Sequence, residues 1–269
     1  MFRSRQCTRS DVADYQVTVA PNGARRQQRD HPMLPITPQE LAQTARQCQA
    51  AGASSLHLHV RDGTGGHSLD AGRYREAMAA IRTAAPGMGI QITTESAGIY
   101  SPEAQLACLE ALRPAAASIA IREMARAPEI AARAYALSAE AGTQVQHILY
   151  SPACIAQLTS WYVAGVVPAA MRDVIFVLGQ YAPATPGRAE GLVEFVSAAQ
   201  ALELSWSLCA FGRDERACLL AAIQAGGHVR VGFENNLETP EGRVLKDNAA
   251  SVAALVKAAS LAGHTLKRT

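Results

Sequence analysis

The chain has 269 residues, of which 49% are hydrophobic and 18% are charged, and its formal net charge is +2. This composition supplies enough apolar side chains for a large core and excludes a disordered chain, while the small net charge excludes the strongly basic surface of a nucleic-acid-binding protein. A polar first segment, the lack of any apolar run of about 18 residues, and six scattered cysteines without a CxxC pair indicate a cytoplasmic protein with no signal peptide, membrane span or disulfide framework.

Eight short β-rich runs alternate with longer helical runs. We expect strands at residues 15–20, 54–60, 89–94, 117–122, 144–150, 173–179, 205–210 and 228–232, and helices at residues 38–51, 71–84, 102–112, 128–141 and 213–225. Several strands, such as the VIFVLG run of the sixth, are almost continuously apolar, which is typical of strands covered on both faces by helices. Helix starts are indicated at Thr37-Pro38, with Glu40 following, and at Ser101-Pro102.

This alternation predicts an α/β fold, a (β/α)8 TIM barrel, with residues 1–269 forming a single domain. An open, doubly wound sheet is the structural alternative, but no strand is followed by a G-x-G-x-x-G sequence or a P-loop. In a barrel of this kind, the catalytic groups lie at the carboxyl ends of the strands and in the loops that follow them. We therefore expect the catalytic and metal-binding residues at these positions.

His57 and His59 are the sharpest functional signal. Side chains at positions i and i+2 of a strand point to the same side, so both imidazoles can bind one ion. Zinc favours nitrogen ligands with a carboxylate as the third ligand and leaves one position open for substrate. A lone buried histidine is usually a hydrogen-bonded core residue, but the HxH sequence favours a metal site. Spacing alone leaves four carboxylates open as the third ligand: Asp62, Glu95, Glu123 and Glu234.

The turn after the last expected strand carries Arg230 and Glu234. The first and last strands of a barrel are neighbours, so this turn should lie near the rim that also carries the first two strands. A surface ion pair is the alternative interpretation of these two residues. Thr93 and Thr94 end the third strand, where they can hydrogen-bond a substrate carboxylate, although threonine is also common in strands.

The sequence resembles the β-keto acid cleavage enzyme family over nearly its whole length. The likeness rests on PNGA at residues 21–24, LPITP at residues 34–38, AGA at residues 51–53, HLHVRD at residues 57–62 with GHS at residues 66–68, and GGHVRVGFENNL at residues 226–237. Together these motifs are specific. The resemblance implies a (β/α)8 barrel with zinc at its carboxyl end, assembled as a homotetramer.

By this likeness the chain is an acyltransferase that cleaves a carbon–carbon bond of a small β-keto acid. The acid and acetyl-CoA give acetoacetate and a new acyl-CoA by retro-Claisen chemistry. Zinc, or another divalent ion, would be held by His57, His59 and Glu234. The implied catalytic positions are Arg230 and Asn235, and the residues expected to contact substrate are Asn22, Thr93, Thr94, Ser118 and Gln146.

Asn235 is the clearest departure from the family pattern. The family commonly has Glu-Asp-Asn after the last strand, with the aspartate as the base, but here the run is Glu234-Asn235-Asn236. An amide cannot accept the proton. Arg25 and Gln146 stand where further family carboxylates are expected, which predicts a more positive pocket and, with it, a more anionic substrate, a different base or altered chemistry. The substitute bases that the sequence offers are Glu95, Glu123 and His147.

Two other functions stay open at this point. One is a metal-dependent aldolase or hydrolase that works on the same scaffold without CoA. The other is a catalytically silent metal- or ligand-binding barrel, which the amide of Asn235 would permit. A shared fold does not decide among these functions, because one scaffold can carry many chemistries.

Overall fold

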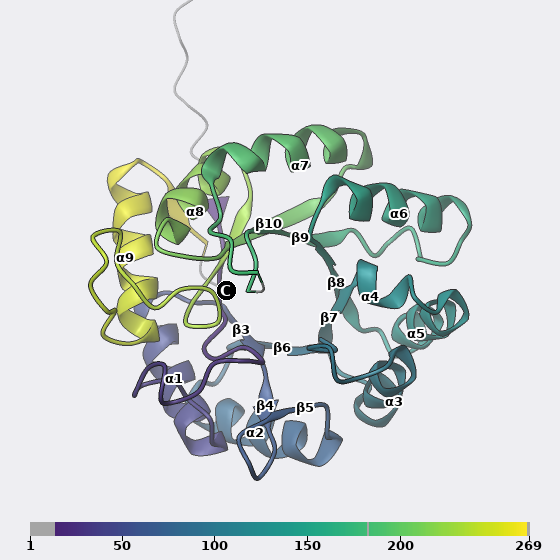
Figure 1. Cartoon of the computed structure of the whole chain (residues 1–269), viewed down its shortest axis with the longest axis horizontal. Helices are drawn as coiled ribbons and strands as arrows, with labels where there is room; N and C mark the ends of the chain where they lie inside the picture. Colours follow the sequence, from purple (N-terminus) through teal and green to yellow (C-terminus); the bar gives the residue numbers. More distant parts are fainter. Residues whose placement is uncertain (1–13, 182, 268–269) are drawn as a thin grey trace, which may run out of the picture.

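The computed structural model describes residues 14–181 and 183–267 and contains a closed barrel of eight parallel strands (Figure 1). The predicted (β/α)8 TIM barrel is therefore confirmed. Around the barrel the strand order is β10-β11-β2-β3-β6-β7-β8-β9, and β9 pairs with β10 to close it. The barrel strands are β2 (Val17–Val19), β3 (Ser55–Leu58), β6 (Gly89–Thr93), β7 (Ala116–Ala120), β8 (Gln144–Leu149), β9 (Asp173–Leu178), β10 (Ser205–Ala210) and β11 (His228–Val231).

Helices form an outer ring around the barrel (Figure 1). They are α1 (Pro38–Ala51), α2 (Ala71–Ala84), α3 (Pro102–Leu112), α4 (Ile121–Met124), α5 (Pro128–Glu140), α6 (Pro152–Val163), α7 (Leu192–Ala199), α8 (Glu215–Gln224) and α9 (Asn248–Leu261), with 3-10 turns η1 (Ala189–Gly191) and η2 (Gln200–Leu202) beside α7. Among the described residues, no helix is long and apolar enough to cross a membrane.

Local sequence explains where the helices begin. The Thr37 hydroxyl accepts a hydrogen bond from the backbone N–H of Glu40, and the Glu40 carboxylate accepts one from the Thr37 N–H, with Pro38 at the first helical position. This capping box satisfies backbone donors that the first helical turn leaves free. Ser101 caps α3 in the same way through the N–H of Ala104. Both predicted helix starts are confirmed.

Three strands differ from the sequence prediction. The first expected strand divides into β2 and a separate β1 (Asp14–Tyr15), which pairs with β12 (Thr265–Leu266) outside the barrel. The second divides at His59, after which β4 (Val60–Arg61) forms an antiparallel pair with β5 (His67–Ser68). The fourth ends at Ala120 and continues directly into helix α4. The breaks after β3 and β7 lie at the carboxyl ends of barrel strands, where the backbone builds the rim, whereas the break between β1 and β2 lies at the amino end of a barrel strand.

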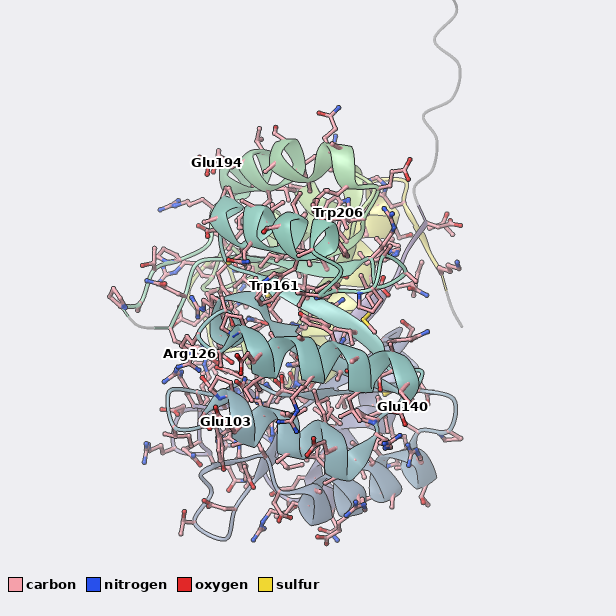
Figure 2. The ribbon with its side chains drawn as sticks, turned by 90° about the vertical axis from the view of Figure 1, so that its right-hand side faces the viewer. Glu103, Arg126, Glu140, Trp161, Glu194 and Trp206 are labelled. Atoms are coloured by element: carbon pink, nitrogen blue, oxygen red, sulfur yellow. The ribbon has the colours of Figure 1, made fainter. Side chains whose placement is uncertain are left out.

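The core lies mainly between the barrel and the surrounding helices. Outward-facing strand side chains pack there against the helices, as in the stack of Phe176 of β9 on Trp206 of β10, with ring centroids 5.4 Å apart. Figure 2 shows the helices of one side, with Trp161 and Trp206 within the protein and charged residues such as Glu140 on the helix surface. In the described part of the chain, the cysteines are free and buried; Cys7 lies outside it.

Candidate metal centre and active site

Three side chains meet at the carboxyl end of the barrel. His57 and His59 leave β3 on the same side, and their Nε2 atoms lie 3.1 Å apart. Glu234, from the loop after β11, places Oε1 3.2 Å from Nε2 of His59 and Oε2 3.9 Å from Nε2 of His57. One ligand atom from each residue fits within a 4.8 Å group, and all three residues are buried. The geometry thus selects Glu234 from the four carboxylates that spacing left open.

Two glycines allow Glu234 to reach this position. Strand β11 lies beside β2, and the N–H of Glu234 donates to the carbonyl of Ala20 at 3.1 Å. Gly232 has φ +145°, and a Cβ there would collide with the same carbonyl. Gly23 has φ +63°, and a Cβ there would lie 2.6 Å from Cγ of Glu234. Only glycine accepts both the backbone angles and the close approach. The sequence motifs around residues 23 and 232 therefore serve the position of one carboxylate.

The donor set fits a divalent ion. Nδ1 of His57 donates a hydrogen bond to Oε1 of Gln91 at 2.8 Å. The proton is therefore on Nδ1, and Nε2 presents its lone pair toward Glu234. Buried Oε2 of Glu234 has no hydrogen-bond partner. Burial, and then the charge of Arg230, hold the pKa of His57 well below its usual value, so the imidazole is in the neutral form that binds metal. Many catalytic zinc sites have two imidazoles and one carboxylate as ligands and leave a coordination position open for substrate.

Glu234 is ionised in this setting. Burial alone would raise its pKa, but the charges of Arg230, His59 and His57 lower that pKa below its usual value. Arg230 and Glu234 are only 4% and 5% exposed, so the alternative of a surface ion pair is wrong. Nη2 of Arg230 donates to Sγ of Cys209 at 3.4 Å, whereas Nε and Nη1 have no partner. Arg230 is therefore a buried cation with unused donors beside the three candidate ligands.

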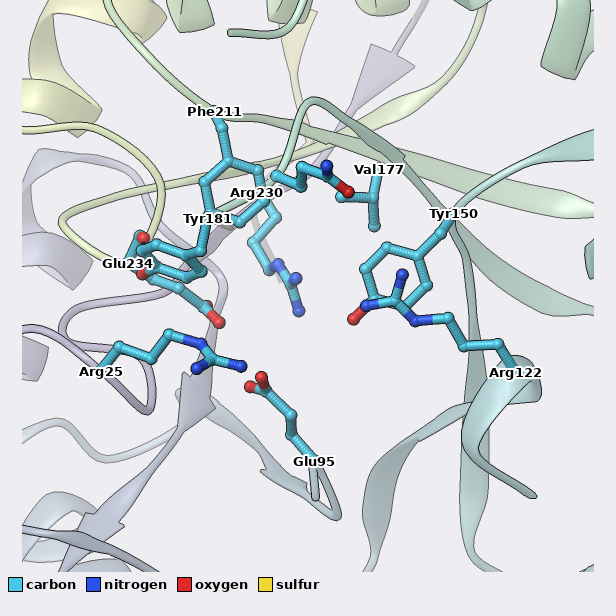
Figure 3. A pocket seen from close by; sticks show the side chains of 10 residues that line it. Arg25, Glu95, Arg122, Tyr150, Val177, Tyr181, Phe211, Arg230 and Glu234 are labelled. Atoms are coloured by element: carbon cyan, nitrogen blue, oxygen red, sulfur yellow. Dashed lines mark hydrogen bonds between the residues drawn. The ribbon is translucent and has the colours of Figure 1, made fainter. Parts of the chain in front are cut away.

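A cavity of about 120 Å³ opens in front of this centre (Figure 3). Its lining includes three arginines (Arg25, Arg122 and Arg230), two carboxylates (Glu95 and Glu234) and a group of largely apolar or aromatic side chains: Tyr150, Val177, Tyr181 and Phe211. In Figure 3 the ends of the Arg25 and Glu95 side chains point toward each other, and Arg230 reaches in from behind. The pocket thus combines metal ligands, cations and one carboxylate that is not part of the three-ligand group.

Glu95 is the one member of the three substitute bases that lines this cavity. Its side chain is 17% exposed, and Oε2 lies 4.0 Å from Nε2 of His59. Glu123 is occupied elsewhere, because its carboxylate accepts from the N–H and hydroxyl of Ser96 and from Nε2 of Gln105 at 2.7–2.9 Å. His147 faces the helices, with its ring nitrogens on the Tyr135 hydroxyl and the Met171 carbonyl. Of these three residues, only Glu95 has its carboxyl at the cavity.

The hydroxyl residues expected to contact substrate are not among those that line the cavity. Thr93 and Ser118 are register partners on β6 and β7, both fully buried, with their hydroxyl oxygens 3.5 Å apart. Oγ1 of Thr93 also accepts from the N–H of Glu95 at 3.0 Å. The Thr94 hydroxyl donates to the Ser118 carbonyl at 2.9 Å, which is a link between strands. In this structure these hydroxyl groups hydrogen-bond one another, the neighbouring strand and the backbone of Glu95, and so they hold the site in position.

Three further sequence candidates lie off the cavity lining. Asn22 is buried and donates from Nδ2 to the carbonyls of Pro35 and His59, so it fixes the backbone beside a ligand. Asn235 is fully buried, and its amide atoms have no partner. Gln146 lines a separate polar cavity at the amino end of the strands, and its Oε1 accepts from Gln91 at 3.3 Å. Gln146 therefore meets the centre only through Gln91 and His57, because its register on β8 places it too low.

Several residues that shape the site were missed by sequence reasoning. Gln91 orients His57 from the neighbouring position of β6, a contact that only the strand register specifies. Arg61 donates to the carbonyls of Gly23, Ala24 and other residues of the loop after β2. Tyr181 lines the cavity and donates to the Glu234 carbonyl. The available signal was position: Tyr150 and Tyr181 both follow the carboxyl ends of strands.

His67, in the GHS motif at residues 66–68, is buried. Its Nε2 hydrogen-bonds the backbone carbonyl of Glu95 at 2.8 Å. Burial lowers the pKa of His67 to about 3, so the ring is neutral and donates this hydrogen bond. The β4–β5 hairpin thereby fixes the loop that carries Glu95.

The sequence also matches a known protein family. The model of the family described as beta-keto acid cleavage enzyme matches residues 15–268. The chain is 29% identical over 258 residues to a 3-keto-5-aminohexanoate cleavage enzyme of Fusobacterium nucleatum, covering 93% of each chain. It is 28% identical over 251 residues to a 3-oxoadipate:acetyl-CoA acetyltransferase of Cupriavidus necator, covering 88% of this chain and 85% of that one.

Among solved structures, the chain is similar in fold to a ternary complex of ObcA with a C4-CoA adduct and oxalate. The TM-score is 0.67 at 15% identity, over 88% of this chain and 65% of the ObcA chain. The chain therefore spans about two thirds of the length of ObcA. At this identity the likeness shows the barrel fold alone.

Proposed function

The chain belongs to the beta-keto acid cleavage enzyme family, and from this premise we propose that it transfers the acyl group of a β-keto acid to CoA. In the proposed reaction, R–CO–CH2–COO⁻ and acetyl-CoA give acetoacetate and R–CO–CoA. The bond between C2 and C3 of the acid and the bond between the acetyl carbon and sulfur break, while C2 forms a bond to the acetyl carbonyl carbon and sulfur forms a bond to the former C3. The printed names of relatives, a cleavage enzyme and an acetyl-CoA acetyltransferase, support this reaction class.

One observation carries the proposal. His57, His59 and Glu234 come together from β3 and the loop after β11, and the same cavity holds a buried arginine and the carboxylate of Glu95. These are the parts that the reaction needs: a site for an electrophilic metal, a cation for developing negative charge, and a base. We further propose zinc as the ion, because two neutral imidazoles and a carboxylate suit it.

A divalent ion bound to these residues would polarise the keto group of the acid and so lower the barrier to removing a C2 proton. Glu95 takes that proton, because its carboxylate lines the cavity and its backbone is fixed at both sides, by Thr93 and His67. The carbanion attacks the thioester carbonyl, and the released thiolate attacks the original ketone. When the C2–C3 bond breaks, Glu95 returns the proton to the acetoacetate carbanion.

Arg230 stabilises the negative oxygens that form at both carbonyl additions. Its Nε and Nη1 are free, and it lines the cavity from the side of β11. A fixed donor aimed at developing charge acts strongly because it needs no reorganisation during the reaction. Val177 and Phe211 provide an apolar wall that limits water around the carbanion.

Turnover by the purified protein tests this proposal. The protein is loaded with zinc and incubated with a panel of β-keto acids and acetyl-CoA, and acetoacetate and the new acyl-CoA are detected by mass spectrometry. We expect both products in equal amounts, and neither from the His57→Ala protein. His228→Gln is the matched control, since His228 lines the polar cavity at the opposite end of the barrel. Products that form without acetyl-CoA would favour the aldolase or hydrolase, and binding without any turnover would favour the silent barrel.

The role of Glu95 has its own test. Replacement by glutamine keeps the size of the side chain and removes the base, which typically costs about 10²–10⁴ in rate. Glu123→Gln and His147→Gln are the comparisons, because neither residue lines the cavity. Zinc content measured by mass spectrometry should stay at the wild-type level in all three variants. If Glu95→Gln turns over like the wild type, another group is the base.

We also expect a cytoplasmic homotetramer with each chain folded as one domain, as the family resemblance implies. Light scattering of the purified protein after size exclusion gives the mass of the assembly directly. The mass of one chain is 28.4 kDa. A mass of one or two chains would contradict the tetramer.

A further inference from the structure

Charge around the cavity is unevenly matched. Three arginines line it, and only two carboxylates do. Glu234 lies near Arg230, where each charge stabilises the other, and Glu95 faces Arg25 across the mouth (Figure 3). Arg122 is left over. Within the described part of the chain, Arg25 and Arg122 both lack an ion pair and a side-chain hydrogen bond, but Arg25 faces a carboxylate of the cavity and Arg122 does not (Figure 3).

Arg122 is an exposed residue, but its guanidinium packs on an aromatic ring. Its guanidinium lies 3.3 Å from the centre of the Tyr150 ring, which is stacking distance. Such stacking fixes the plane of the guanidinium and leaves its N–H groups free at the edge. Helix α4 starts directly after β7 and carries Arg122 to the rim of the cavity. A planar, fixed guanidinium without a partner is well suited to bind a carboxylate through two parallel hydrogen bonds.

Arg122 and the candidate metal ligands lie on different sides of the cavity. In Figure 3, Glu234 is on one side, Tyr150 and Arg122 are on the other, and Arg230 lies between them. A substrate with its keto acid end at His57, His59 and Glu234 therefore directs its far end toward Arg122. The cavity of about 120 Å³ has space for on the order of ten water-sized spheres, which is comparable to the heavy atoms of a short keto diacid.

We propose that the substrate of this chain is a β-keto acid with a second carboxylate, and that Arg122, stacked on Tyr150, binds that far carboxylate. This inference rests on the proposed function and adds the charge class of the acyl group. The names of the two relatives do not decide it, because one acts on an acid with an amino group and the other on 3-oxoadipate, a dicarboxylate. Arg122, which faces no carboxylate of the cavity, is the feature of this chain that favours a dicarboxylate.

The phosphates of CoA are the other anions that an arginine could bind. They are separated from the thiol by the whole pantetheine arm. A group that lines the same small cavity as Arg230 and Glu234 cannot reach those phosphates while the thioester carbonyl is at the reacting centre. We therefore expect Arg122 to act on the acid and not on CoA, and the KM for acetyl-CoA measures this separately.

A matched pair of acids tests the proposal. The zinc-loaded protein is titrated by calorimetry, without acetyl-CoA, with 3-oxoadipate and with 3-oxohexanoate, which has a methyl group in place of the far carboxylate. We expect the wild type to bind the diacid about 10- to 100-fold more tightly, as one charge-assisted contact provides. In Arg122→Gln this ratio should fall to about threefold or less. Arg126→Gln, an exposed arginine on the next turn that does not line the cavity, should keep the wild-type ratio.

Turnover with acetyl-CoA separates this proposal from the proposed function. If the diacid is preferred in binding and no acyl-CoA forms from it, the carboxylate site stands and the cleavage reaction is wrong. If acyl-CoA forms equally well from both acids, the cleavage reaction stands and the carboxylate site is wrong. A ratio that Arg122→Gln leaves unchanged, or a KM for acetyl-CoA that rises tenfold in this variant, would also overturn the assignment of Arg122 to the acid.

Discussion

Replacement of Gln91 by leucine should weaken metal binding without touching a metal ligand. Oε1 of Gln91 accepts the Nδ1–H of His57 at 2.8 Å and so fixes both the tautomer and the direction of the ring. Leucine has a similar size and no polar atom. His57 is only 1% exposed, so the change leaves its Nδ1–H without its protein acceptor in a buried position. Loss of such an outer partner typically costs 10- to 100-fold in metal affinity, or about 1.4–2.7 kcal/mol, and we expect the upper part of this range.

Competition with a zinc-binding dye measures this change. Gln146→Leu removes only the next link, a 3.3 Å hydrogen bond from Gln91, and should raise the zinc Kd by a few-fold at most. Gln144→Leu lines the same polar cavity without bonding Gln91 and serves as the matched control. Wild-type zinc affinity in a folded Gln91→Leu protein would refute the reasoning, because it would mean that Nδ1 of His57 does not need this acceptor.

Three other changes have expected outcomes. Burial raises the pKa of Glu215 to about 8 from 4.5, so between these pH values the folded chain keeps a proton that the unfolded chain loses, and the free energy of unfolding falls as pH rises. Urea unfolding at pH 5 and pH 8 should show this fall, on the order of 4 kcal/mol, in the wild type and not in Glu215→Gln. Gly232→Ala should lower stability by about 2–4 kcal/mol and lose zinc, since its Cβ would collide with the Ala20 carbonyl; unchanged thermal melting would contradict this. Arg61→Met leaves several loop carbonyls without a donor and should cost about 2–4 kcal/mol in urea unfolding, whereas a loss under 0.5 kcal/mol would mean that water replaces the guanidinium.

Much of the fold was predictable because its signals are local. Apolar β-rich runs, helix caps and the HxH sequence each depend on a few neighbouring residues. The third metal ligand did not have such a signal, because Glu234 reaches His59 only after β11 pairs with β2 and two glycines allow the close approach. Long-range register also decided Gln146, which the sequence assigned to substrate and which lies near the other end of the barrel.

The three substitute bases show the same limit. Glu95 and Glu123 both follow strands, and no local pattern separates them. The difference arises because β7 continues into α4, which turns Glu123 toward Ser96 and Gln105, whereas β6 ends in an irregular loop that leaves Glu95 facing the cavity. His147 was excluded by strand parity, since its side chain points outward to Tyr135. Such facts need the backbone path and not only the residue types.

The departures from the family pattern bear on the pocket to different degrees. Gln146 lies away from the cavity, and Asn235 does not line it, so these two changes leave the charge at its surface unaltered. Arg25 alone lines it, and an arginine in place of a carboxylate changes the local charge by two units. Burial raises the pKa of Glu95, and the charge of Arg25, which faces this carboxyl, acts in the opposite direction. Arg25 thus offsets part of the shift that burial imposes on the pKa of the proposed base. Because Glu95 faces Arg25, Arg122 has no carboxylate of the cavity opposite it and is open to a second anionic group.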